Sequence, residues 1–251
     1  GTVANESFNS DIPATAQISL GKGEFGGVVG VSSGLVNNCW SHIKYDIISS
    51  YDIIPDEENS VFGGIVGKTL GGTIANVNYF GNIVGNIEKN STTTGGIVGT
   101  AEAETNLYKV LSYIFVYAGT YHISADNGNF NLVEDEDATS QGLKTTYYFS
   151  MATDGGVGTK MGFFEAFDNL AQAKVGNSKF KSYYGIWAEE QDGFNMSLPR
   201  LKIEKPVSTT NGRDEDNSIE IPNEAYFAEM LMYEAASEVG RYYKLTKGDE
   251  G

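Results

Sequence analysis

Three related pentapeptides decide the fold predicted for this chain. They are Gly26-Gly27-Val28-Val29-Gly30, Gly63-Gly64-Ile65-Val66-Gly67 and Gly95-Gly96-Ile97-Val98-Gly99, which lie 37 and 32 residues apart. In each copy, glycines bracket a short β-branched strand, and glycine permits a positive φ or a close approach between backbones. Repetition at about 20–50 residues is the signature of stacked supersecondary units. We therefore expect stacked coils with a corner at each pentapeptide.

A second block accompanies the pentapeptides. It reads Gly1-Thr2-Val3-Ala4-Asn5, Gly34-Leu35-Val36-Asn37-Asn38 and Gly72-Thr73-Ile74-Ala75-Asn76. In a strand, the apolar third residue and the asparagine two positions later share one face. Stacking then places Val3, Val36 and Ile74 in one column and Asn5, Asn38 and Asn76 in another. The asparagines could hydrogen-bond along the stack, as polar ladders do in cross-β structures, or each could cap its own turn.

The pairing of these two blocks resembles the GLUG-motif repeat of large bacterial secreted and surface proteins. That family includes the non-catalytic region of immunoglobulin-A-cleaving metallopeptidases. Residues 145–149, 161–174, 187 and 197–201 are similar to the tail with which such arrays end, so the resemblance covers residues 1–205. It implies a mainly β, right-handed parallel β-solenoid or β-helix-like fold that is extracellular or at the cell surface and has no catalysis of its own.

The repeats suggest how the chain is divided. We expect repeat cores at 1–30, 34–67 and 72–99, and an irregular end over 100–205, because Ala101-Glu102-Ala103-Glu104 replaces the expected second block. The polar, turn-rich stretch 206–218 is predicted to be a linker. Residues 219–251 then form a helical segment, which either caps this domain or starts a next unit.

Several elements are predicted outside the repeats. Asp126-Asn127-Gly128 separates two β-rich runs, which indicates a capping β-hairpin. Apolar residues at helical spacing predict a helix over Phe163–Lys174 and another over Asn223–Val239. The chain opens inside a repeat, and Arg241–Thr246 resembles the segment that opens GLUG-type domains, so we expect a slice of a longer array whose export signal has been removed.

Composition limits the possible partners. The 251 residues include 17 Lys and Arg against 33 Asp and Glu, for a formal net charge of −16. Nucleic-acid binding depends on clustered basic residues, so no nucleic-acid partner is expected. The 40% hydrophobic and 12% aromatic residues suffice for a core, yet no run of about 20 apolar residues is present. Direct membrane insertion is therefore not predicted.

No catalytic residues are predicted. Cys39 is the only cysteine, and His42 lies three residues beyond it. In the next repeat Cys39 aligns with Val77, so we interpret this cysteine as a small buried hydrophobe rather than a nucleophile. The chain also lacks a His-Glu-x-x-His zinc motif, a nucleophile elbow and a phosphate-binding loop.

Two kinds of residue could still bind a ligand. The acidic runs Glu134–Asp137 and Asp214–Asn217 supply oxygen ligands for calcium but lack a known calcium spacing, so we expect solvated loops and no metal site or cofactor. Aromatic side chains could stack on a glycan, although burial in the core is their more usual role. The aromatic candidates are Trp40, Tyr45, Tyr51 and Tyr79.

Two classes of function follow from these patterns. The first is a non-enzymatic bacterial surface or secreted module, acting as an adhesion platform or structural stalk and binding a host or bacterial surface protein or a glycan. The alternative is a carbohydrate-active β-helix enzyme, a glycan lyase or hydrolase, with its site on the solenoid flank. A convergent acidic cleft beside exposed aromatics would favour the enzyme.

Overall fold

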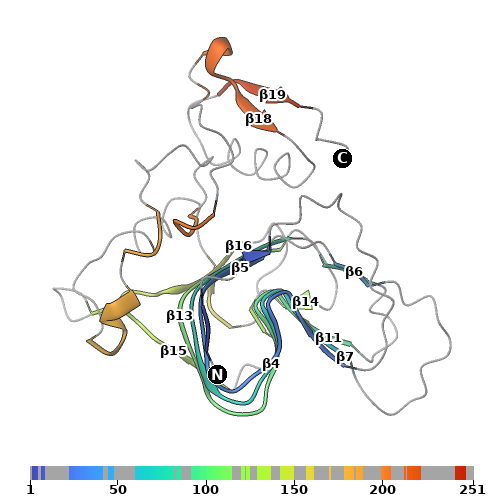
Figure 1. Cartoon of the computed structure of the whole chain (residues 1–251), viewed down its shortest axis with the longest axis vertical. Helices are drawn as coiled ribbons and strands as arrows, with labels where there is room; N and C mark the ends of the chain where they lie inside the picture. Colours follow the sequence, from blue (N-terminus) through green and yellow to red (C-terminus); the bar gives the residue numbers. More distant parts are fainter. Residues whose placement is uncertain are drawn as a thin grey trace.

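The computed structural model of the chain is mainly β, with parallel sheets (Figure 1). It describes residues 2–4, 7–8, 23–41, 45–47, 60–81, 83–85, 92–114, 120–121, 123–124, 129–136, 142–149, 157–160, 170, 178–183, 185–188, 199–204, 212, 214–221 and 241–246. Within these residues, two short 3-10 helices accompany the strands, namely η2 (Ser178–Tyr183) and η3 (Glu215–Asn217).

The largest sheet, here called the long sheet, takes strands from successive repeats. Its order is β1 (Thr2–Ala4), β5 (Leu35–Ser41), β9 (Gly72–Gly81), β13 (Thr105–Ile114), β16 (Thr146–Phe149) and β17 (Thr159–Lys160), with β2 (Ser7–Phe8) beside β5 and β15 (Phe130–Leu132) beside β13. Val3 pairs with Val36, Val36 with Ile74 and Ile74 with Leu107. The predicted apolar column is therefore confirmed, and it extends one strand further than the repeat indicated.

Two smaller sheets follow the same order of repeats. One consists of β14 (Thr120–Tyr121), β11 (Thr92–Gly95), β7 (Ser60–Gly63) and β3 (Glu24–Gly26), and the other of β12 (Val98–Ala101), β8 (Val66–Thr69) and β4 (Val29–Ser32). Separate parallel pairs join β6 (Tyr45–Ile47) to β10 (Ile83–Gly85) and β18 (Ile219–Ile221) to β19 (Tyr243–Leu245). In Figure 1, equivalent strands of successive repeats lie over one another.

Each glycine pentapeptide is a bend between two strands. It links β3 to β4, β7 to β8 and β11 to β12, so the expected strand bracketed by glycines is wrong, whereas the expected corner is present. A Cβ atom at Gly63 would lie 1.8 Å from the Val66 carbonyl oxygen, and one at Gly64 would lie 2.4 Å from Cγ of Tyr79. Close backbone and ring contacts therefore require glycine here, and neither residue has a positive φ.

A left-handed residue recurs at one position of the long sheet. The φ values are 55° at Asn38, 49° at Asn76 and 51° at Lys109, the three non-glycine residues with positive φ in the described part of the chain. The register of β5, β9 and β13 aligns all three, because their flanking residues pair. Asparagine adopts this conformation more readily than most residues, which explains why it recurs in the repeat.

The left-handed residue changes which side chains face the core. Alternation along a regular strand would place residues three apart on opposite faces. Here Ile74 and Val77 belong to the same buried cluster, whereas Ala75 belongs to another. The same spacing recurs in the strands on either side, where the paired core residues are Val36 with Cys39 and Leu107 with Val110. Each kink thus lets one strand supply two groups of residues to a single core.

The predicted β-hairpin is wrong. Strand β15 runs parallel to β13, with Thr105 paired to Phe130, and β14 runs parallel to β11. The Ile97 amide donates to the Ile123 carbonyl oxygen at 3.1 Å, as the Ile65 amide does to Ile97 one repeat earlier. The chain therefore continues the path of the earlier repeats after residue 100. The pattern is hard to see in the sequence because Tyr121 takes the register position of Gly95.

Other predictions fall largely outside the described residues. The helix expected over Phe163–Lys174 is described only at Leu170, and the one expected over Asn223–Val239 is not described. Within the expected linker, the Gly212 carbonyl accepts a 2.9 Å hydrogen bond from the Tyr242 amide, next to β19. Among the helices in the described part of the chain, none has the length and hydropathy needed to cross a membrane.

Substitution of Asn38 tests the left-handed position. At an ordinary strand position valine is preferred to glycine, but a β-branched residue is strained at positive φ. We expect Asn38→Val to lower the free energy of unfolding by about 1–3 kcal/mol, and Asn38→Gly to lower it less. Urea denaturation of both variants measures the difference. Valine proving the better tolerated residue would contradict a left-handed Asn38.

Candidate functional site

Two of the four aromatic residues predicted to bind a glycan, Trp40 and Tyr79, are buried. Trp40 is 4% exposed and Tyr79 is fully buried, with the ring of Tyr79 in the core beside Gly64. Tyr45 lies in β6, and Tyr51 lies outside the described residues. Because stacking on a sugar requires an accessible ring face, Trp40 and Tyr79 do not serve as that surface.

Cys39 is the buried hydrophobe that the repeat alignment predicts. Its side chain is fully buried in the core, and its register partner in β9 is Val77. The thiol donates a 3.2 Å hydrogen bond to the Asn37 carbonyl oxygen. His42 lies outside the described residues.

Both acidic runs are predicted to be solvated loops, but only the second is exposed throughout. In the first run, Asp135 is only 2% exposed, whereas Glu134 forms an ion pair with Lys144 nearer the surface. In the second, Asp214 caps η3 by accepting a 2.9 Å hydrogen bond from the Asn217 amide. The prediction for the first run is therefore wrong at Asp135. No group of three or more potential metal-binding side chains occurs in the described part of the chain.

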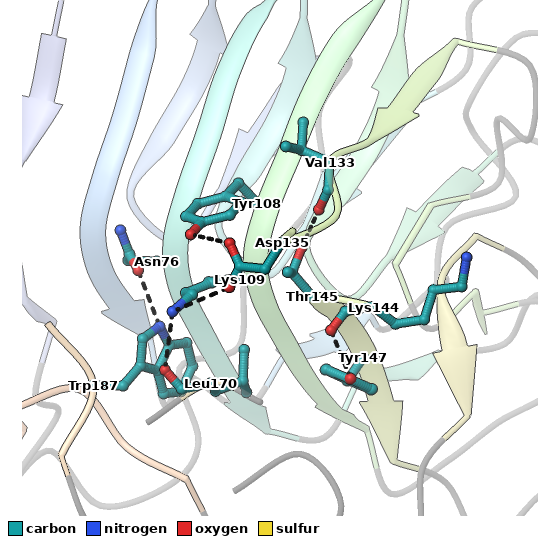
Figure 2. Close-up of polar contacts among 10 residues, drawn as sticks. All are labelled: Asn76, Tyr108, Lys109, Val133, Asp135, Lys144, Thr145, Tyr147, Leu170 and Trp187. Carbon is teal, nitrogen blue, oxygen red and sulfur yellow. Dashed lines mark hydrogen bonds and ion pairs between the residues drawn. The ribbon is translucent and has the colours of Figure 1, made fainter. Parts of the chain in front are cut away.

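The most unusual group of polar side chains surrounds Lys109 and Asp135. Lys109 is 1% exposed, and its Nζ lies 3.6 Å from Oδ2 of Asp135. The hydroxyl of Tyr108 donates to Oδ1 of the same carboxylate at 2.7 Å. Figure 2 shows the lysine and the tyrosine converging on Asp135 from adjacent positions of β13, with the carbonyl oxygen of Leu170 3.5 Å from Nζ.

The path of the chain explains how Asp135 reaches this place. Strand β15 ends where Leu132 pairs with Leu107, and the chain returns to the sheet where the Thr145 carbonyl accepts from the Val110 amide at 2.9 Å. The Val133 amide still donates to the Leu107 carbonyl oxygen at 2.9 Å, and Asp135 follows it at the level of the left-handed Lys109. An antiparallel bridge between Asp135 and Leu143 closes this excursion.

The surroundings of Lys109 are aromatic and apolar. Phe180 of η2 stacks on Tyr108 with ring centroids 4.6 Å apart, and Tyr183 packs beside them. Nζ of Lys109 itself lies 5.7 Å from the Tyr108 ring centroid. Burial lowers the pKa of Lys109 from its ordinary value, and the charge and hydrogen bonding of Asp135 oppose that effect only in part.

Neighbouring polar contacts attach later segments to the same face of the long sheet. Trp187 Nε1 donates to Oδ1 of Asn76 at 3.1 Å, and Asn78 Nδ2 lies 3.0 and 3.1 Å from the two carboxylate oxygens of Glu204. Asn76 also donates to Oδ1 of Asn37 at 3.0 Å, which links two repeats. This bond joins two repeats, but it reaches Asn37 rather than Asn38, the residue predicted to share a column with Asn76. The other partner of the Asn76 side chain is Trp187, so these contacts match neither the predicted ladder nor the predicted cap.

This arrangement limits the chemistry available to the polar side chains. Lys109, Asp135, Asn78 and Glu204 are all buried, so they bind segments of the chain itself rather than a ligand from solvent. Sequence reasoning missed Lys109 because lysine there replaces the repeated asparagine. Alignment of Thr105-Asn106-Leu107-Tyr108-Lys109 with the second block would have located it, whereas no signal distinguished Asp135 from its acidic neighbours.

Comparisons with protein-family models, curated proteins and solved structures found no match. The resemblance to GLUG repeats therefore stays a prediction that rests on the two sequence blocks.

Two asparagine substitutions test whether these contacts hold the later segment on the sheet. Asn78→Ala removes the amide that bonds the buried carboxylate of Glu204, and hydrogen bonds to charged groups contribute about 1.5–3 kcal/mol. The matched control is Asn131→Ala, which removes an exposed 2.8 Å amide bond to Asn106 and should cost less than about 0.5 kcal/mol. Equal losses of unfolding free energy in chemical denaturation would contradict this role of Asn78.

Proposed function

We propose that this chain is a non-enzymatic module of a bacterial surface or secreted protein, in which it serves as a structural stalk or an adhesion platform. In this proposal the parallel strands wind as a right-handed β-solenoid, and each repeat forms one coil. The partner is a host or bacterial surface protein or a glycan. It is bound by residues other than the buried side chains described above.

The observation that carries the proposal is the constant register of the stack. Gly26, Gly63 and Gly95 share one register position at the bend, as Asn38 and Asn76 do at the kink. Parallel neighbours lie about 4.8 Å apart, so each repeat lengthens the stack without changing its cross-section. Such a structure suits a spacer.

The ends of the sheets give further support. Strands β1, β3 and β4 lie at the same end of their three sheets, and each pairs on one side only with strands in the described part of the chain. Strand edges present backbone donors and acceptors that another β unit can pair with. The stack can thus be extended by further repeats of a longer array.

The use of polar groups also favours a structural role. The buried lysine, aspartate and glutamate described above bond to segments of this chain. The net charge of −16, from 33 acidic and 17 basic residues, opposes binding to polyanions and favours solubility.

Labelling of intact cells tests the location on which the proposed role depends. An antibody raised against the purified chain should label unpermeabilised cells of the source bacterium, or detect the protein in the culture medium, because a stalk or adhesion platform acts outside the cytoplasm. Permeabilised cells and a cytoplasmic marker protein serve as controls. Labelling that appears only after permeabilisation, with none in the medium, would overturn the proposal.

A further inference from the structure

We propose that Lys109 and Asp135 form an intramolecular isopeptide bond, an amide between Nζ of the lysine and Cγ of the aspartate. This modification site is inferred from the burial and geometry of the two side chains and does not depend on the proposed function. The bond would join β13 to the excursion that follows β15.

The position of Lys109 is the first reason. It stands in the column where earlier repeats place Asn38 and Asn76, with a φ of 51° and 1% of its surface exposed. A left-handed lysine with a buried amine is unfavourable on both counts. Strained residues of this kind persist where the surrounding structure enforces them, and they gather at functional sites.

The geometry of the pair is the second reason. The 3.6 Å separation of Lys109 Nζ from Asp135 Oδ2 exceeds the 2.7–2.9 Å of a good charge-assisted hydrogen bond, so as an ion pair it compensates burial poorly. Cγ, the atom that the amine would attack, is bonded directly to Oδ2, so this contact also places Nζ beside that carbon. Attack requires the two reacting atoms to approach to about 3–3.5 Å. The Tyr108 hydroxyl donates a 2.7 Å hydrogen bond to Oδ1 of Asp135, which holds the carboxylate in place. Negative charge develops on this oxygen during attack, so the same hydrogen bond stabilises it.

The surroundings favour condensation over hydrolysis. Ala75, Val133 and Phe180 form a buried cluster with Tyr108, and Tyr183 packs against it. Exclusion of water from this space disfavours the charged ammonium of Lys109 and slows hydrolysis of an amide once it has formed. The lowered pKa of Lys109 agrees with such a neutral amine.

The reaction is balanced without a further reagent. A proton passes from the Lys109 ammonium to the Asp135 carboxylate, which leaves an amine and a carboxylic acid. The nitrogen lone pair then attacks Cγ and forms the C–N bond. The C–OH bond breaks, and its hydroxyl leaves as water with a proton from the nitrogen, so the products are one amide and one water molecule.

Two other ion pairs provide controls within the same chain. Lys68 contacts Glu102, and Lys144 contacts Glu134, both more closely than Lys109 contacts Asp135. Their side chains are partly or largely accessible to solvent, at 21% and 56% for the first pair and 56% and 36% for the second. Solvated ions of this kind do not condense, so the proposal predicts a bond at the buried pair alone.

Mass spectrometry of the purified, denatured chain tests the proposal. We expect the intact mass to be lower than the sequence mass by one water molecule. Trypsin should no longer cut after Lys109, so residues 90–144 should appear as one peptide that is lighter by one water. A second protease that cuts before Asp126 should convert this peptide into a branched product. A full-length mass equal to the sequence mass, or a missing water that maps elsewhere, would overturn the proposal.

Two variants check the chemistry. Lys109→Arg retains the charge but provides a poor nucleophile, so the full sequence mass should return. Asp135→Asn should still condense, with loss of ammonia in place of water. An arginine variant that still lacks one water would overturn the assignment to Lys109. Should either variant fail to fold, the peptide map of the unaltered chain decides the question alone.

Discussion

The left-handed backbone at Asn38, Asn76 and Lys109 is the constraint on which the rest of the structure depends. Without it, β5, β9 and β13 would each turn one of their two groups of apolar residues away from the core. With it, Ile74 and Val77 face the same cluster. Because the kinks align across neighbouring strands, each repeat reinforces the conformation of the next.

This kink also determines where polar side chains gather. A strand that bends at one position leaves space on its outer side, and later segments of the chain occupy it through Asn76, Asn78 and Lys109. The resulting contacts are buried and internal, which supports a structural interpretation of the long sheet. Lys109 differs from Asn76 and Asn78 because its side chain ends in an amine rather than an amide. This amine lies beside the buried carboxylate of Asp135.

The sequence predicts the parts of the fold that depend on repetition. Gly63 and its equivalents reveal the bends because contacts there exclude a Cβ atom, and Val36 and Ile74 reveal the register because both fill one column. Prediction failed where the structural repeat continues but the sequence motif does not. Tyr121 occupies the register position of Gly95, so no glycine marks the bend at that point. The sequence therefore predicts a hairpin where the parallel strand β15 is present.

The site could be predicted even less well, for a physical reason. Whether a residue such as Asp135 is buried depends on what packs over it, and the segments that do so come from distant parts of the chain. Trp40 and Tyr79 illustrate the same limit, since their surroundings and not their residue type determine whether they contact solvent. Local pattern carries little information about such long-range burial.

Crosslinking across one register pair tests the central claim of in-register stacking most directly. Cys39 pairs with Val77, and parallel neighbours about 4.8 Å apart fall within the range of Cα separations that a disulfide spans. Oxidation of a Val77→Cys variant should join it to Cys39, whereas Ala75→Cys, which lies in a different buried cluster, should leave both thiols free. A crosslink formed by Ala75→Cys but not by Val77→Cys would contradict the register and the kink between them.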